Sequence, residues 1–141
     1  MILKVQRIQK NAKVPNTAYK GDAGLDLYSV KEILIKSKNR TIIETGIAVE
    51  IPDGYVGLVW DRSSVPAKYG LTTMGGVIDS GYRGEIRIIM YNTSAEDFVI
   101  KKHEKIAQLL IQKIESPKIL EVLELSDSER GKKTFGSSNK K

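Results

Sequence analysis

The sequence predicts an all-β domain, a sandwich or barrel, with one short helix and a mobile C-terminal arm. The main evidence is a series of short β-branched and aromatic runs, separated by turn residues every eight to twelve positions. The length of 141 residues fits one domain with a single core. From about Ser126 the composition changes, and the chain becomes polar and almost free of apolar side chains.

Eight segments have the composition of strands: residues 2–9, 33–35, 40–51, 54–60, 85–92, 98–100, 107–115 and 119–123. In the third of these, positions 43, 45, 47 and 49 share one face by period-two spacing. Pro52-Asp53-Gly54 predicts a turn, because proline presets φ and glycine accepts positive φ. Residues 63–70 predict the short helix, with a serine able to cap its start and Gly70 to end it.

The change of composition divides the chain into a β-domain of residues 1–125 and an arm of residues 126–141. We expect the arm to be mobile when no ligand is present. Phe135 is an isolated aromatic residue in this arm. Such a residue often has no role, but it is also suited to dock as an anchor, with Arg130 and backbone amides available for phosphate.

The formal net charge of +6 is carried by dispersed basic residues that alternate with acids. We interpret it as favouring solubility, with a preference for an anionic small molecule. One tryptophan, six tyrosines and two phenylalanines are too few for a nucleic-acid stacking platform. A nucleic-acid-binding β-domain is therefore a weak alternative, which predicts steeply salt-dependent binding.

The chain contains no cysteine, which excludes a disulfide framework and a thiolate metal site. Its single histidine, His103, cannot form a histidine cluster and is expected to be an exposed loop residue. No apolar run approaches the length of a membrane span, and the N-terminus lacks a signal-peptide core. We therefore expect a cytoplasmic protein without membrane contact.

Residues 75–86 form the strongest candidate for chemistry. Four glycines bound a predicted hairpin that presents Asp79 and Tyr82, with Ile78 and Ile86 anchoring its arms in the core. Asp79 directly follows apolar residues, and a carboxylate in apolar surroundings costs folding free energy unless it has a partner or a functional role. The ordinary alternative is a polar β-turn with no further role.

Four other segments carry polar groups in apolar surroundings. Asp26 lies between two leucines, and Arg62 with Ser63 forms an anion-binding corner at the start of the predicted helix. Gln108 places an amide in an otherwise apolar strand, and the arm contributes residues 130–138. Each group also has a purely structural explanation, such as a loop cap, a surface charge or a satisfied strand residue.

Taken in order, the segments AGLDLY, RSS, GVIDSGYRGEI, IAQLL and RGKKTFGSS resemble the five motifs of the homotrimeric dUTPase family, over residues 23–138. The resemblance implies a jelly-roll-like fold of the dUTPase β-clip type and a homotrimer with shared active sites. It also implies Mg²⁺-assisted hydrolysis of dUTP to dUMP and pyrophosphate. That reaction keeps uracil out of DNA and supplies dUMP for dTMP synthesis.

By position, the resemblance makes Asp79 the general base that activates water for attack on the α-phosphorus. Tyr82 would pack on the deoxyribose and exclude a ribose hydroxyl. The backbone from about Thr73 to Val77 would read the edge of uracil, and its close approach would reject the 5-methyl group of thymine. The binding residues implied here are Gly76, Val77 and Ile78.

By the same correspondence of motif positions, the resemblance implies that Asp26 holds magnesium through a water molecule. The residues expected to contact the phosphates, or to support that contact, are Arg62, Ser63, Ser64 and Gln108. From the arm, Phe135 would stack on uracil while Arg130, Gly136 and Ser137 close on the phosphates.

Three positions depart from the family pattern. Asp61 stands where proline or glycine is usual, and Ser64 stands where glycine is usual. The Asp61 charge lies near the expected phosphate site, where it would alter affinity. Lys133-Thr134 replaces paired glycines, which stiffens the arm, although Lys132 and Lys133 could compensate as cations.

Two other readings involve the same fold. A dCTP deaminase would need a glutamate beyond Gly84, where this chain has Ile89, which cannot activate water. A non-catalytic, nucleotide-responsive regulator is disfavoured because the whole set of catalytic and binding residues is retained.

Overall fold

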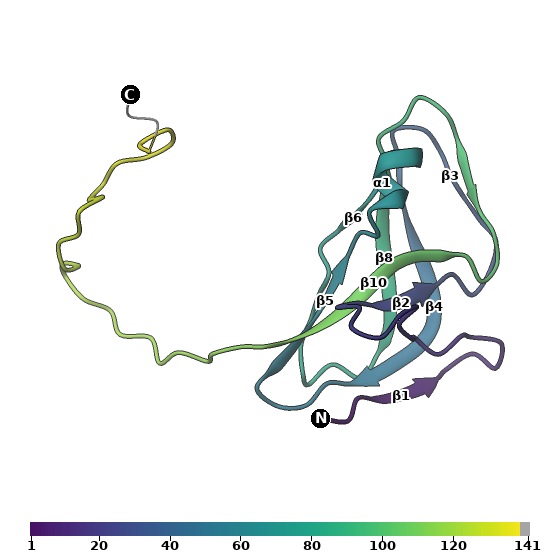
Figure 1. Cartoon of the computed structure of the whole chain (residues 1–141), viewed down its shortest axis with the longest axis horizontal. Coiled ribbons are helices and arrows are strands. Elements are labelled where there is room, and N and C mark those ends of the chain that lie inside the picture. Colours follow the sequence, from purple (N-terminus) through teal and green to yellow (C-terminus); the bar gives the residue numbers. More distant parts are fainter. Residues whose placement is uncertain (139–141) are drawn as a thin grey trace.

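The computed structural model describes residues 1–138 and is almost entirely β-structure (Figure 1). Its strands are β1 (Lys4–Arg7), β2 (Leu25–Tyr28), β3 (Ile33–Ile35), β4 (Arg40–Glu50), β5 (Tyr55–Trp60), β6 (Leu71–Met74), β7 (Val77–Ile78), β8 (Glu85–Asn92), β9 (Phe98–Ile100) and β10 (Lys105–Lys113). A single short helix in this part of the chain, α1 (Ser64–Tyr69), follows β5.

The strands form two four-stranded antiparallel sheets and one two-stranded pair. The sheet orders are β1-β4-β8-β6 and β2-β10-β5-β7, and β3 pairs with β9. Most neighbours in a sheet are distant in sequence, as jelly-roll connections require. Side chains from both sheets build one core, including Ile47 and Ile88 from the first and Leu27 and Leu109 from the second. The predicted all-β, jelly-roll-like class is confirmed.

The long strand β4 shows how the sequence pattern creates this core. Ile43, Thr45, Ile47 and Val49 are all buried, which confirms their predicted common face. The one polar member of this stripe, Thr45, donates its hydroxyl to the Ile86 carbonyl at 2.6 Å. Each fully buried aliphatic side chain contributes about 1.5–3 kcal/mol, so this stripe is a major source of stability.

Some strands were predicted closely and others were missed. Residues 33–35, 85–92 and 98–100 match β3, β8 and β9 in full, but β2, β6 and β7 were not predicted as strands. These three are short, and β7 has only two residues, so they offer too few positions for an alternating pattern.

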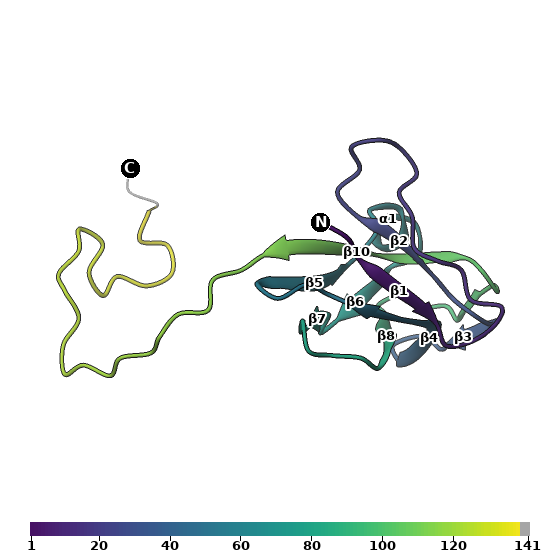
Figure 2. The same ribbon diagram turned by 90° about the horizontal axis from the view of Figure 1, so that it is seen from below.

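The strand predicted at residues 119–123 is wrong for the single chain. No helix or strand follows β10 in the described residues, and every residue from 112 to 136 is exposed. Figures 1 and 2 show this segment leaving the end of β10 and standing away from the body. A strand needs a hydrogen-bonding partner, and none lies beside this segment. The last three positions of the predicted arm, 139–141, lie outside the described residues.

Two local predictions need correction. The helix ends as expected at Gly70, whose φ is 66° and whose N–H donates to the Pro66 carbonyl. Ser63 occupies the N-cap position but makes no side-chain cap hydrogen bond. His103 is only partly exposed: it adopts a φ of 63°, and its Nε2 lies 2.8 Å from the Asn11 carbonyl oxygen. No helix among residues 1–138 is both long and apolar enough to cross a bilayer.

Candidate active site

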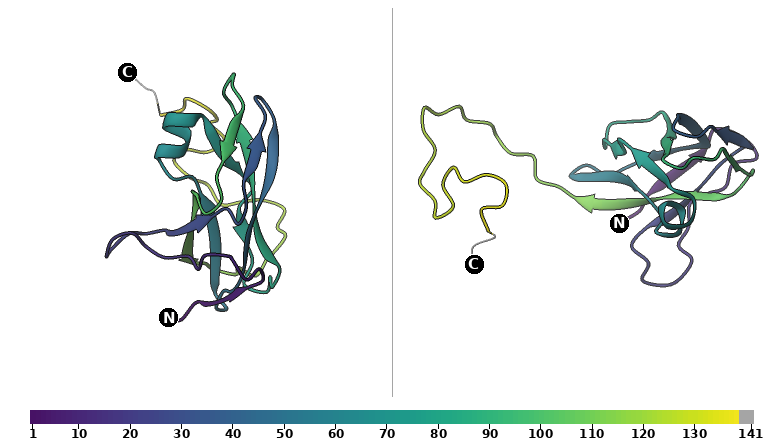
Figure 3. Two further views of the ribbon diagram at one scale, coloured as in Figure 1. Left: turned by 90° about the vertical axis from the view of Figure 1, so that its right-hand side faces the viewer. Right: turned by 90° about the horizontal axis from the view of Figure 1, so that it is seen from above.

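The predicted site residues fall into three separate groups in this chain. The first lies on the hairpin between β7 and β8, and the second lies where β2, β10 and the β5–α1 turn meet. The third lies on the C-terminal arm, which extends away from the body of the domain in the right-hand view of Figure 3. The two pockets share no lining residue, so one chain by itself does not assemble the whole predicted site.

The hairpin group lines a pocket of about 250 Å³. The lining residues are Ile42, Val77, Ile78, Asp79, Tyr82, Glu85, Arg87 and Ile89. Its arms are anchored as predicted, since Ile86 is fully buried and Ile78 is half-buried. Asp79 itself is exposed, so its carboxylate carries no burial cost that a partner would have to offset. The carboxylate is therefore open to water.

The Tyr82 ring is held in place by two local contacts. Its hydroxyl donates to the Glu85 carbonyl at 2.9 Å, and the Tyr82 N–H donates to the Asp79 carbonyl at 3.1 Å. The ring packs over Gly84, where a Cβ atom would lie 2.4 Å from the tyrosine hydroxyl oxygen. Glycine at position 84 is therefore required for this ring position.

Gly76 fixes the chain that leads into the hairpin. Its φ is +103°, and a Cβ atom there would lie 2.7 Å from the Val59 carbonyl oxygen. The Gly76 carbonyl accepts the Val59 N–H at 2.8 Å, which holds this segment against β5. Because β7 is the last strand of its sheet, its other edge has no partner strand, and Val77 is exposed.

The second group lines a polar pocket of about 290 Å³. Its members are Ala18, Tyr19, Asp22, Ala23, Gly24, Asp26, Arg62, Ser63, Ser64 and Gln108. Five of the predicted site residues therefore meet here: Asp26, Arg62, Ser63, Ser64 and Gln108. Since Ser63 does not cap the helix, its exposed hydroxyl remains available to a ligand.

Asp26 lies between two cations at this pocket. Its Oδ1 is 2.9 Å from Arg62 Nε, and its Oδ2 is 2.7 Å from Lys105 Nζ. Asp26 is 7% exposed, whereas both cations reach solvent. The hydrogen bond to Asp26 raises the pKa of Lys105, so the ammonium stays charged at neutral pH. A buried carboxylate thus orders two positive charges beside the polar pocket.

Gln108 is also fixed by its surroundings. Its Nε2 donates to the Asp61 carbonyl at 2.8 Å. The side chain passes over Gly24, where a Cβ atom would lie 2.2 Å from Gln108 Oε1. Gly24 and Gln108 therefore bring β2, β10 and the end of β5 together.

The Asp61 carboxylate does not lie in the polar pocket, contrary to the expected charge beside the phosphate site. Its Oδ2 accepts the Thr72 hydroxyl at 2.6 Å, and its Oδ1 accepts the Thr73 N–H at 2.7 Å. These two donors on β6 offset much of its charge.

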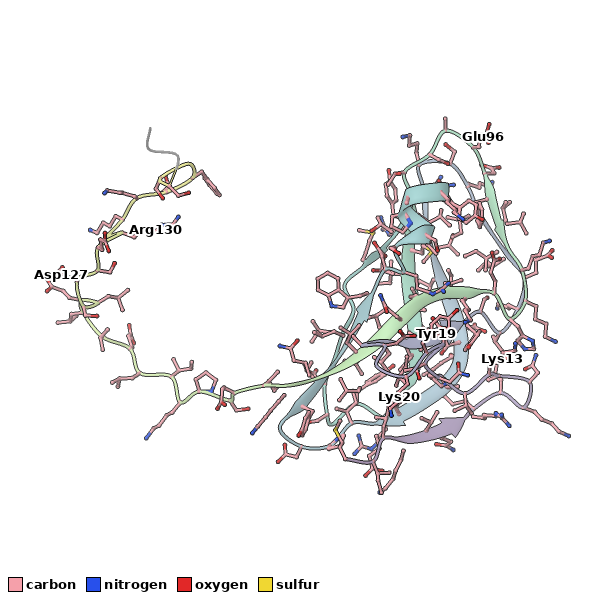
Figure 4. The ribbon with its side chains drawn as sticks, in the orientation of Figure 1. Lys13, Tyr19, Lys20, Glu96, Asp127 and Arg130 are labelled. Atoms are coloured by element: carbon pink, nitrogen blue, oxygen red, sulfur yellow. The ribbon has the colours of Figure 1, made fainter. Side chains whose placement is uncertain are left out.

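The arm residues lie far from both pockets in this conformation. Figure 4 places Arg130 and Asp127 on the detached segment, whereas Tyr19 and Lys20 lie on the body of the domain. Arg130 Nε donates to the Lys133 carbonyl at 3.2 Å, within the arm itself. Phe135 is fully exposed.

Sequence reasoning missed Lys105, which pairs with Asp26 beside the polar pocket, and two residues that line this pocket, Tyr19 and Asp22. Lys105 is the first residue of β10 and directly precedes the segment IAQLL, and a cation at the start of an apolar strand was a usable signal. Tyr19 and Asp22 lie on the loop before β2, where Asp22 Oδ2 accepts the Tyr19 N–H at 2.8 Å. Nothing in the local pattern of that loop indicates that it borders a pocket.

The fold and the two pockets define an all-β protein with a cation-bearing polar pocket and a separate acidic hairpin, a combination suited to a charged small molecule. The family model described as dUTPase matches residues 10–139. The chain belongs to the dUTPase family.

Individual relatives agree over nearly the whole chain. It is 49% identical to the deoxyuridine 5'-triphosphate nucleotidohydrolase of Clostridium kluyveri, covering 98% of each sequence. It is 40% identical to that of Paramecium bursaria Chlorella virus 1, covering 96% of each. Among solved structures, a G164S mutant of Staphylococcus bacteriophage 80alpha dUTPase with dUpNHpp matches with a TM-score of 0.93, at 35% identity. That match covers 97% of this chain and 98% of the other.

Proposed function

We propose that the chain hydrolyses dUTP to dUMP and pyrophosphate in a homotrimer whose active sites lie between subunits. The observation that carries the proposal is the combination of an acidic hairpin pocket with a separate, cation-bearing polar pocket. A nucleoside triphosphate needs both kinds of surface, one for its base and sugar and one for its phosphates. Relatives named for this substrate, and one solved with dUpNHpp, support the assignment.

In the proposed reaction Asp79 is the general base. Its exposed carboxylate takes a proton from a water molecule whose oxygen attacks the α-phosphorus. The bond from that phosphorus to the oxygen bridging to the β-phosphate breaks, and pyrophosphate leaves. A positioned base of this kind contributes roughly 10²–10⁴-fold to the rate.

The nucleoside would bind at the hairpin. The edge of β7 that has no partner strand offers backbone groups of Gly76, Val77 and Ile78 to the edge of uracil. The fixed Tyr82 ring provides a flat surface for deoxyribose, where a ribose 2′-hydroxyl would not fit. Ile89 is an apolar member of the lining of this pocket, and it cannot perform the water activation that a deaminase requires.

The triphosphate would bind in the polar pocket. Ser63, Ser64 and Gln108 offer hydroxyl and amide groups, and Arg62 supplies positive charge ordered by Asp26. Phosphoryl transfer depends mainly on positioning and charge neutralisation, so these groups suffice without a side-chain nucleophile. In this proposal the arm closes over the nucleotide, with Phe135 on uracil and Arg130, Gly136 and Ser137 at the phosphates, and it excludes water.

The residues of the polar pocket fit a hydrated magnesium ion. Among residues 1–138 no group of three His, Cys, Asp or Glu side chains is placed to enclose a metal ion. The pocket does contain two carboxylates, Asp22 and Asp26, and Mg²⁺ is usually held by one or two carboxylates together with substrate phosphates and water. Asp26 would therefore act through a water molecule. Bound magnesium would neutralise part of the phosphate charge. A phage phi11 relative is described with a structural Mg(II) ion.

An exposed apolar row supports the trimer. Ile42, Ile89 and Met74 are paired in register across β4, β8 and β6, and all three are exposed. An apolar row of this kind is expected to be covered in an assembly. Because it borders the hairpin pocket, a neighbouring subunit packed there could complete the site with its own polar pocket.

The test is incubation with dUTP, UTP, dTTP and dCTP plus Mg²⁺, followed by anion-exchange separation of products. Conversion of dUTP alone to dUMP and pyrophosphate supports the proposal. Tight binding of dUTP without turnover would indicate a regulatory protein, and deamination of dCTP would overturn the assignment. Light scattering should give three times the chain mass of 15.7 kDa.

A further inference from the structure

We propose that Asp61 is a positioning residue for the triphosphate, an inference that rests on the proposed function. Asp61 is one of the three positions at which this chain departs from its family pattern, and its hydrogen bonds reach two other strands, β6 and β10. Its two carboxylate oxygens accept from Thr72 and Thr73, and its carbonyl accepts from Gln108. Asp61 also directly precedes Arg62, whose guanidinium pairs with Asp26.

The bonds of Asp61 join the two sheets. Asp61 follows the end of β5 in one sheet, and β6 is the outer strand of the other. The Thr73 N–H has no strand beside it on that side of β6, and the Asp61 carboxylate takes the place of one. A carboxylate accepting one amide and one hydroxyl is held in a single orientation, because charge-assisted hydrogen bonds are short and directional.

The two sides of this contact differ in rigidity. β6 is held independently, since it pairs with β8 from Leu71 to Met74. The turn at residues 61–63 belongs to no strand or helix. Loss of the carboxylate would therefore release the turn rather than the strand. The groups displaced would be Arg62, Ser63 and the amide of Gln108, which serve the phosphates, while the hairpin that serves the nucleoside would stay in place.

Because phosphate binding should weaken while nucleoside binding is kept, the relative affinity for two nucleotides tests the proposal. A general loss of stability would not change that relative affinity. We compare the affinities of the full-length protein for dUMP and for dUpNHpp, in the wild type and in Asp61→Ala, together with kcat for dUTP. The expected result is at least a fivefold fall in the preference for dUpNHpp over dUMP, with a lower kcat. Thr72→Val removes one of the two donors and should give a smaller fall. Asp61→Asn keeps one acceptor oxygen for the Thr73 N–H, and its amide nitrogen can donate to the Thr72 hydroxyl, so it should restore most of the preference.

Asp97→Ala is the matched control, because Asp97 Oδ1 accepts the Ser37 N–H at 2.8 Å in an exposed loop away from both pockets. It loses the same kind of bond and should keep the wild-type preference. If Asp61→Ala does not fold, Thr72→Val decides the question by itself. A wild-type preference and kcat in an active protein carrying either substitution would overturn the positioning role alone. A wild type that does not hydrolyse dUTP would overturn the proposed function, and this inference with it.

Discussion

Asp26 Oδ1 and Arg62 Nε lie 2.9 Å apart, and this contact ties β2 to the turn between β5 and α1. With Lys105 on the other carboxylate oxygen, the buried acid is fully paired. Removal of such an acid leaves two cations facing each other without a counter-charge.

Asp26→Asn should therefore destabilise the protein and weaken nucleotide binding. We expect the free energy of unfolding to fall by about 1–3 kcal/mol, less than for a fully buried pair because both cations reach solvent. Urea denaturation at one fixed protein concentration measures this loss. Asp53→Asn, on the exposed turn before β5, is the control and should leave stability unchanged. Equal stability of the two variants would contradict the structural role of the pair.

Asp79→Asn should abolish most turnover but keep nucleotide affinity. The amide keeps the shape of the side chain but cannot take a proton, so kcat should fall by about 10²–10⁴-fold. Product chromatography gives kcat, and calorimetric titration with dUpNHpp gives affinity. Substantial activity in this variant would mean that another group is the base.

Gly84→Ala should displace the Tyr82 ring and reduce discrimination against UTP. The new Cβ atom would lie within 2.4 Å of the tyrosine hydroxyl oxygen, so the ring has to move. We expect kcat/KM for dUTP to fall by about tenfold, or about 1.4 kcal/mol. In a Tyr82→Ala background the same substitution should have little further effect. If the effects of Gly84→Ala and Tyr82→Ala on kcat/KM were fully additive, Gly84→Ala would not act by displacing the Tyr82 ring.

Deletion of residues 130–141 should lower activity strongly without unfolding the β-domain. Residues 130–136 are all exposed, so this described part of the deleted segment is not buried in the core of the chain. Circular dichroism on heating should give the wild-type transition, while dUTP turnover falls. Phe135→Ala should reproduce part of the loss, whereas Phe135→Trp should not. Unchanged turnover in the deletion variant would refute the closing role of the arm.

Lys105 should hold its charge well into the alkaline range. The hydrogen bond to Asp26 raises the pKa of Lys105, so the pair stabilises the fold fully below the ordinary lysine value and is lost as pH rises through the raised one. The difference in melting temperature between wild type and Lys105→Met should therefore be constant from pH 7 to about pH 10 and shrink above that. A difference that shrinks already between pH 7 and pH 9 would contradict this assignment.

The sequence by itself determined the fold class, several strands and the family. Alternation in β4 reports which side chains are buried, because residues two apart share a face whatever strand lies beside them. The five ordered motifs identified the candidate site residues for the same reason, because each motif is a local pattern that can be recognised without knowing which segments lie beside it.

Only the tertiary structure decided which of those residues meet. Composition could not show that β6 borders β8, that Asp61 faces Thr72 and Thr73, or that Lys105 shares Asp26 with Arg62. Nor could it show that the hairpin and the polar pocket are separate within one chain. Strand pairing joins segments distant in sequence, and it is selected by the burial of the whole core rather than by any local pattern.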